Sequence, residues 1–237
     1  MSNHQTGRSF LAALQLADSF FPSGMYAHSH GLESMVARGW VKNADDVAQY
    51  LHNLLAWSIL PCDGVALVNA HRAARYGDLE TLTDIDWHLH AMKLPEEFRL
   101  ASCHSGRRIL DETASLMTCD SGASISADYR QLVLEHATPG TGAVALGVVA
   151  HAFDIPADNA LLMYCHSFAV GMLGAAQRLL PLTHSEAQRI LLSMQEPTTG
   201  SAANLNARDW REMTSFSPQA DIASMLHSHD DVRMFAS

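Results

Sequence analysis

Lysine is almost absent from the sequence, because Lys42 and Lys93 are the only two among 237 residues. Neither lysine follows the glycine pattern of a phosphate-binding P-loop, so we do not expect nucleotide hydrolysis by that route. The HExxH, GxSxG and GxGxxG patterns of metalloproteases, hydrolases and dinucleotide-binding folds are missing as well. An enzyme would have to depend on scattered histidine and acidic residues, and we therefore expect none.

Cysteine is scarce and widely spaced, and no CxxC pair occurs. The four cysteines are Cys62, Cys103, Cys119 and Cys165. This spacing argues against a zinc ribbon or a thioredoxin-like redox site. The N-terminal residues are polar, which argues against a secretory signal peptide, and no apolar stretch reaches the roughly 18 residues of a membrane span. Free thiols without a signal or a span predict a cytoplasmic protein.

Positive charge is in deficit, since 15 Lys and Arg residues face 25 Asp and Glu residues and the net charge is -10. Nucleic acid is not an expected partner, because the chain has no basic stripe that could displace counterions from phosphates. Hydrophobic residues make up 48% and charged residues 17% of the chain. This composition is typical of a globular domain with a sizeable core.

The alternation of apolar and polar residues that marks strands is also missing, and apolar residues recur with helical spacing instead. We predict an all-α fold, a single-domain helical bundle of about ten helices. Residues 1–8 are expected to form a flexible N-terminus. Residues 9–237 are expected to form one all-helical domain that ends in a C-terminal docking tail. The Ser- and Gly-rich segment 118–127 is predicted to be a mobile loop within that domain.

Capping residues and prolines predict where individual helices begin and end. Thr183 and Glu186 match a capping box, in which each side chain bonds the other residue's backbone N–H. Asn43 is predicted to cap another helix. Pro61 is expected to break a helix, and Pro197 is expected to lie in a turn.

The segment 157–180 is apolar nearly all round, which predicts a helix at the centre of the fold. It contains the small residues Gly171, Gly174, Ala175 and Ala176. Each glycine in a helix costs about 1 kcal/mol in helix propensity. We therefore expect another helix to pack tightly on this segment, either within the chain or across a dimer.

Histidine is in excess, with 14 residues, and three pairs have His-x-His spacing. Neutral imidazole is a good ligand for nickel, zinc and copper. Residues two apart point to different sides of a helix, however, so such a pair cannot chelate from a helix. We expect no metal site, and His227 with His229 is the strongest of three weak candidates. A His-rich nickel-binding metallochaperone or a metal-dependent hydrolase stays open as the alternative function.

One segment of the chain resembles a known family. Residues 14–33 read LQLADSFFPSGMYAHSHGLE, and they closely resemble the N-terminal signature of the UreF family, which is roughly LQL followed by P-x-G-x-[YF]-x-x-S-x-G-L-E. Residues 177–183, QRLLPLT, and the C-terminal residues 221–237 resemble later blocks of the family in the same order. Arg99 and Gly106 match further family positions on a helix.

The resemblance implies an all-α protein that forms a homodimer and has no cofactor. It implies a scaffold that links a UreD/UreH-type accessory protein to the UreG-type GTPase. The resulting assembly would insert nickel into apo-urease, and the scaffold would control when the GTPase acts. The missing P-loop agrees with a helper role, because the GTPase itself would carry that motif.

The resemblance also implies partner-binding residues at both ends of the chain. Pro22 and Gly24 would shape a rigid turn, and this turn would present Tyr26 to the GTPase, because exposed tyrosines are common interface anchors. Ser29 and Glu33 would share the same helix face, since they are four residues apart.

The UreD/UreH-type protein is expected to contact Arg178, Arg233 and Phe235. Arg178 lies near the end of an apolar helix, where the helix dipole favours a cation. A tail that carries a cation and an aromatic ring is expected to lie outside its own monomer and to become ordered when a partner binds.

Overall fold

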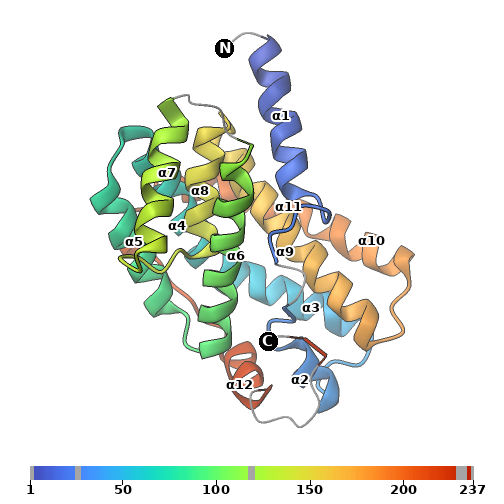
Figure 1. Cartoon of the computed structure of the whole chain (residues 1–237). Coiled ribbons are helices and arrows are strands. Elements are labelled where there is room, and N and C mark those ends of the chain that lie inside the picture. The colour runs from blue at the N-terminus through green and yellow to red at the C-terminus, as the bar shows by residue number, and fades with distance from the viewer. Residues whose placement is uncertain (1–2, 25–27, 117–120, 228–233, 236–237) are drawn as a thin grey trace.

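The computed structural model describes residues 3–24, 28–116, 121–227 and 234–235 (Figure 1). Within these ranges the secondary structure is helical and contains no strand, which confirms the predicted all-α, single-domain fold. The elements in chain order are α1 (Asn3–Ala17), α2 (Leu32–Ala37), α3 (Ala44–Leu54), the π-helix η2 (Leu55–Gly64), α4 (Val65–Tyr76), α5 (Leu79–Met92), α6 (Glu96–Ala114), α7 (Ser121–Leu134), α8 (Gly142–Ala152), α9 (Ala157–Leu179), α10 (His184–Ser193), α11 (Gln195–Leu205), the 3-10 helix η3 (Trp210–Glu212) and α12 (Pro218–His227).

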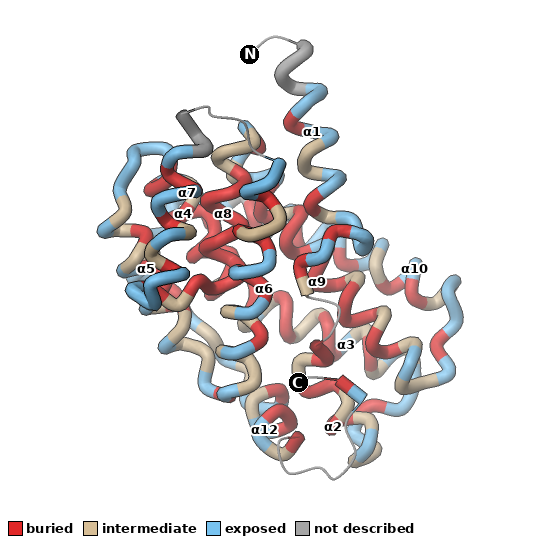
Figure 2. Tube along the Cα trace, in the orientation of Figure 1, coloured by how far each residue is buried: buried red, intermediate tan, exposed pale blue. Residues whose placement is uncertain are grey.

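Helix α8 is the most completely buried element, because its residues from Gly142 to Ala150 are all buried (Figure 2). It packs against α4, and a Cβ atom added at Gly147 would lie 2.5 Å from the carbonyl oxygen of Leu67. Only glycine fits this approach. On α9 we expected another helix to pack tightly, but the space beside Gly174 holds no atom within 4 Å of such a Cβ, so packing across a dimer at this glycine stays a prediction.

Helix α9 nevertheless lies at the centre of the fold, as predicted, and is buried over most of its length. Two helical runs, Ala44–Tyr76 and Ala157–Leu179, are long and apolar enough to cross a membrane by these two criteria alone. In their most apolar windows, 67% and 72% of the residues are buried inside the fold. Such burial is what core helices of a folded domain show.

The prediction that Pro61 breaks a helix is wrong, because α3, η2 and α4 form one continuous helical run. A proline inside an α-helix lacks the N–H donor and collides with the carbonyl four residues earlier, which here belongs to Trp57. The chain adopts the wider π-helix over Leu55–Gly64, and the Trp57 oxygen accepts a hydrogen bond from the Phe216 N–H at 2.8 Å instead.

The other local predictions have mixed outcomes. Asn43 accepts hydrogen bonds from two backbone N–H groups of α3, and Thr183 with Glu186 forms the predicted capping box. Pro197 lies inside α11 and not in a turn. It is tolerated because N–H groups in the first turn of a helix have no intrahelical partner. The predicted loop 118–127 is shorter than expected, since α7 already begins at Ser121.

Helix α1 extends beyond the rest of the molecule at its N-terminal end (Figure 1). It begins at Asn3, whereas we expected the helical domain to begin at residue 9. The flexibility of residues 1–8 stays a prediction. The side chains of Phe10, Leu11 and Leu14 are 59%, 65% and 52% exposed. This helix therefore presents an apolar strip to its surroundings.

A buried carboxylate fixes the loop between α7 and α8. Asp86 on α5 accepts hydrogen bonds from the hydroxyls of Tyr129, Thr138 and Thr141. Its carboxylate also accepts the backbone N–H of Gly140 at 2.6 Å and that of Thr141 at 2.8 Å. Because Asp86 is fully buried, these donors offset the cost of removing its charge from water.

Candidate protein-docking site

The turn that follows α1 is built by local hydrogen bonds. The carboxylate of Asp18 accepts the backbone N–H of Phe20 at 2.7 Å, and the Asp18 carbonyl accepts that of Phe21 at 3.0 Å. Gly24 has a φ of 76°, a left-handed conformation that favours glycine. The turn leaves the Phe20 side chain 94% exposed, beside a groove of about 510 Å³ that Leu116, two residues after the end of α6, also lines.

The predicted GTPase-facing residues have different places in the structure. Tyr26 lies outside the described residues. Ser29 is fully buried, and its Oγ accepts the backbone N–H of Glu33 at 3.4 Å. Its side chain therefore lies inside the fold, and not on the surface where the sequence analysis placed it. Glu33 lies in the first turn of α2, with its side chain 13% exposed.

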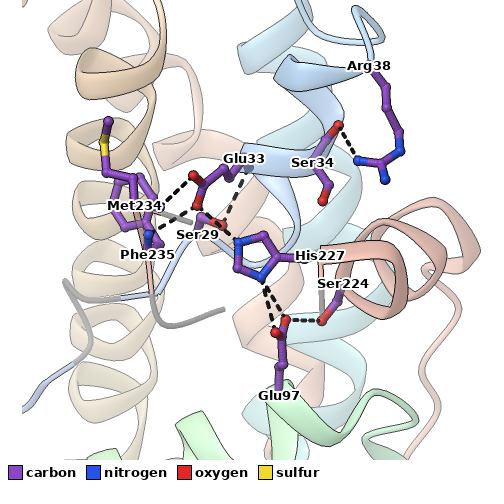
Figure 3. A network of polar contacts seen from close by, with 9 residues as sticks. All are labelled: Ser29, Glu33, Ser34, Arg38, Glu97, Ser224, His227, Met234 and Phe235. Atoms are coloured by element: carbon purple, nitrogen blue, oxygen red, sulfur yellow. Dashed lines mark hydrogen bonds and ion pairs between the residues drawn. The ribbon is translucent and has the colours of Figure 1, made fainter. Parts of the chain in front are cut away.

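A polar network around Glu33 joins four distant parts of the chain (Figure 3). Its carboxylate accepts the backbone N–H of Met234 at 2.7 Å and that of Phe235 at 3.1 Å. The same carboxylate lies 3.1 Å from Nε2 of His227 on α12. On the other side of the ring, Nδ1 of His227 lies 3.1 Å from the carboxylate of Glu97 on α6. We call Glu33, Glu97, His227 and the two tail N–H groups the tail-holding cluster.

The imidazole of His227 is fully buried between the two carboxylates. Each ring nitrogen of His227 lies within hydrogen-bond distance of one carboxylate, Nε2 next to Glu33 and Nδ1 next to Glu97. Both nitrogens are occupied and neither can bind a metal ion in this arrangement. His229 lies outside the described residues, and no group of three or more His, Cys, Asp or Glu in the described part of the chain could hold a metal ion.

The prediction that the tail lies outside its own monomer is wrong for Phe235, which is only 6% exposed and belongs to the hydrophobic core. Two interactions hold it there. The carboxylate of Glu33 binds its backbone N–H, and the guanidinium carbon of Arg178 lies 5.6 Å from its ring centroid, within cation–π distance. Arg233 lies outside the described residues.

The structure thus brings together residues that the sequence analysis assigned to two partners. Glu33 was assigned to the GTPase side, and Arg178 with Phe235 to the UreD/UreH side, yet Phe235 contacts both of the others. Sequence reasoning missed Glu97, which is 130 residues away from His227 along the chain. No local pattern around Glu97 marks this contact.

Two histidines lie under the surface in residues 18–33, which we call the N-terminal segment. Burial, with a smaller contribution from the nearby His104, lowers the pKa of His28 to about 4. Burial also lowers the pKa of His30 to about 3, and the charges of His28 and Lys93 add to this effect. The His30 ring packs against Phe98 and Phe168. Both imidazoles are therefore neutral at pH 7.

A small cavity of about 60 Å³ lies beside these histidines. Its wall includes a buried ion pair, in which Nζ of Lys93 donates to both carboxylate oxygens of Asp63 at 2.8 and 2.9 Å. The Tyr164 hydroxyl donates to the same carboxylate at 2.9 Å. These contacts satisfy the carboxylate, and they connect Lys93, the residue directly after α5, to η2 and α9.

Comparison with known proteins gives a consistent result. The sequence model of the UreF family matches residues 41–195. The chain is similar to "Urease accessory protein UreF 2" of Brucella canis, with 30% identity over 234 residues that cover 99% of this chain and 94% of the relative. It is also similar to "Urease accessory protein UreF" of Trichodesmium erythraeum, with 31% identity over 230 residues and 96% of each chain covered.

Proposed function

The chain belongs to the UreF family of urease accessory proteins, and we propose that it is a non-catalytic scaffold in urease maturation. It links a UreD/UreH-type accessory protein to the UreG-type GTPase in the cytoplasm, so that nickel is inserted into apo-urease under control of the GTPase. The observation that carries this proposal is the extent of the similarity, because the aligned region covers 99% of this chain and 94% of a named accessory protein.

The exposed turn at the start of the N-terminal segment supports a docking role. Phe20 presents a nearly fully exposed aromatic ring beside a groove, and aromatic side chains dominate the binding energy of many interfaces. In our proposal the GTPase docks at this turn, through Phe20 and Tyr26. The UreD/UreH-type protein docks at the tail, next to Arg178, Arg233 and Phe235.

The tail-holding cluster supports a coupling between these two partners. Glu33 belongs to the N-terminal segment and also binds the tail through two N–H groups. A partner that stabilises the docked tail therefore stabilises the conformation of Glu33. By thermodynamic linkage, each partner then changes the affinity of the other by the same factor.

Helix α1 supports the homodimer. The chain has a net charge of -10, but Asn3–Ala17 contains no Asp or Glu. Two acidic copies repel each other over most of their surface, whereas α1 offers an apolar strip of Phe10, Leu11 and Leu14 without that repulsion. In our proposal a second copy of the chain covers this strip. Leu11→Arg should convert the dimer to a monomer in light scattering, and a dimer of unchanged mass would place the interface elsewhere.

A capture experiment with purified proteins tests the scaffold. Tyr26→Ala should weaken capture of the GTPase while the helical circular dichroism spectrum stays unchanged. Tyr76→Ala is the matched control, because Tyr76 is 75% exposed at the end of α4, outside the N-terminal segment. Equal capture by both variants would reject the proposed GTPase surface.

Deletion of residues 232–237 tests the coupling. The truncated protein should lose affinity for the UreD/UreH-type protein, because the docked tail is gone. It should also bind the GTPase more weakly, since Glu33 then lacks its tail ligands. Full GTPase binding by the truncated protein would show that the two surfaces act independently.

A further inference from the structure

We propose that Pro61 is a positioning residue, which reserves the carbonyl of Trp57 for the segment 214–217 and thereby fixes where α12 begins. We call this segment the strap. It connects η3 to α12, and it lies against η2 through both backbone and side-chain contacts.

The hydrogen bonds of the strap converge on the part of η2 that Pro61 perturbs. The Phe216 N–H donates to the Trp57 carbonyl at 2.8 Å, and the Thr214 N–H donates to the Pro61 carbonyl at 3.1 Å. Between them, the hydroxyls of Ser58 and Ser215 lie 2.9 Å apart. Trp57 is four residues before Pro61, so its oxygen is the acceptor that an α-helical N–H at position 61 would occupy.

The strap also positions α12, which supplies His227 to the tail-holding cluster. Helix α12 packs beside α2, which carries Glu33 (Figure 1). At the start of α12, a Cβ atom added at Gly31 would lie 3.0 Å from the Ala220 carbonyl oxygen. A shift of the strap would therefore disturb the backbone beside α2. The consequence for partner binding rests on the proposed function, whereas the position of the strap does not.

Hydrogen exchange of single amides in the full-length protein tests the proposal. Pro61→Ala restores an N–H that competes for the Trp57 oxygen, so the amides of Thr214 and Phe216 should exchange faster by about fivefold or more, as loss of one hydrogen bond implies. The Ala145 amide of α8, bonded to the Thr141 carbonyl at 2.9 Å, serves as the internal reference. Faster exchange at Thr214 and Phe216 with Ala145 unchanged supports the proposal.

Two further variants distinguish a specific effect from general destabilisation. Phe216→Pro removes the N–H group that donates to the Trp57 carbonyl and changes no residue of η2. The Thr214 amide should therefore exchange faster in this variant too. Adding Phe216→Pro to Pro61→Ala should then have little extra effect at Thr214, because both changes remove the same hydrogen bond. Pro197→Ala is the control, since Pro197 lies in the first turn of α11, and it should leave the strap unchanged.

Unchanged exchange at Thr214 and Phe216 in Pro61→Ala would overturn the proposal. Additive effects of Pro61→Ala and Phe216→Pro at Thr214 would overturn it as well. Because these measurements use the isolated protein, a failure to bind partners does not affect them. Failure of the proposed function and failure of this proposal are therefore distinguishable.

Discussion

Two carboxylates hold loops of this protein in the same way, but in different surroundings. Asp86 binds the consecutive N–H groups of Gly140 and Thr141, and Glu33 binds those of Met234 and Phe235. Asp86 is fully buried and also receives three hydroxyl donors. Glu33 is 13% exposed and receives one imidazole in addition.

The difference indicates which loop belongs permanently to the fold. If the loop moved away from Asp86, the buried carboxylate would lose its hydrogen-bond donors, and a buried charge without donors is strongly destabilising. Removing the tail from Glu33 would leave a carboxylate at the edge of the molecule, where water can replace the lost N–H donors. We therefore expect the loop bound by Asp86 to stay in place and the tail bound by Glu33 to dock and undock.

The largest effect is expected from Asp86→Ala, which leaves the hydroxyls and N–H groups around it without an acceptor. The free energy of unfolding should fall by about 3–5 kcal/mol. Urea unfolding followed by circular dichroism measures this loss. Asp111→Ala, at the partly exposed ion pair of Arg130 and Asp111, should cost at most about 1 kcal/mol. A loss of that size for Asp86→Ala would contradict the comparison.

Acid should destabilise the N-terminal segment. The pKa of His28 falls to about 4 and that of His30 to about 3 on folding, from 6.5. Below pH 6.5 the unfolded chain binds protons on these rings and the folded protein does not, until the pH reaches about 4 for His28 and about 3 for His30. Stability is therefore complete above pH 6.5 and declines from there toward pH 4, by up to about 1.4 kcal/mol per pH unit for each ring.

Urea unfolding at several pH values between 7.5 and 5 checks this, with the wild-type protein and His30→Gln. The variant should show a shallower decline, because it lacks one of the two rings. The exposed His184 provides the control, and His184→Gln should leave the slope unchanged. Equal slopes for wild type and His30→Gln would contradict the cause that we assign to the decline.

Glu33→Gln should have a smaller and more local effect. The neutral amide weakens two charge-assisted hydrogen bonds, so undocking of the tail should become easier by about 1–3 kcal/mol. Hydrogen exchange at the Met234 and Phe235 amides measures this. Glu112→Gln is the control, because the Glu112 carboxylate forms an exposed pair with Arg108 and lies outside the tail-holding cluster. If these amides kept their protection in Glu33→Gln, Glu33 would not be what holds the tail.

The smallest effect is expected from Arg178→Met, which keeps the apolar stem and removes the cation above the Phe235 ring. An exposed cation–π contact contributes about 0.5–1 kcal/mol, so exchange at the Phe235 amide should rise only slightly. Arg189→Met, on the exposed side of α10, should leave that amide unchanged. A larger effect than that of Glu33→Gln would reverse the ranking of the two contacts.

Features set by a few neighbouring residues could be predicted from the sequence. The capping box of Thr183 and Glu186 and the cap at Asn43 depend on atoms within three residues, and the structure has both. The all-α class follows from apolar spacing, which is also local. The family assignment came from short motifs in order along the chain.

Features that depend on distant residues could not be predicted. Pro61 stays in a helical run, and the strap, more than 150 residues later, donates a hydrogen bond to the Trp57 carbonyl that has no partner at position 61. Phe235 is buried, and its N–H group and that of Met234 are bound by Glu33, about 200 residues earlier. Neither contact leaves a periodic or local trace, so the sequence alone favoured a broken helix and a free tail.

Reconstitution from purified components tests the scaffold role most directly. This chain, the UreD/UreH-type protein and the UreG-type GTPase with nucleotide are mixed in pairs and all together, and size-exclusion chromatography with light scattering gives the mass of each complex. The account predicts that the GTPase and the UreD/UreH-type protein elute as one complex only when this chain is present. Their association without it, or the elution of this chain apart from both, would contradict the account.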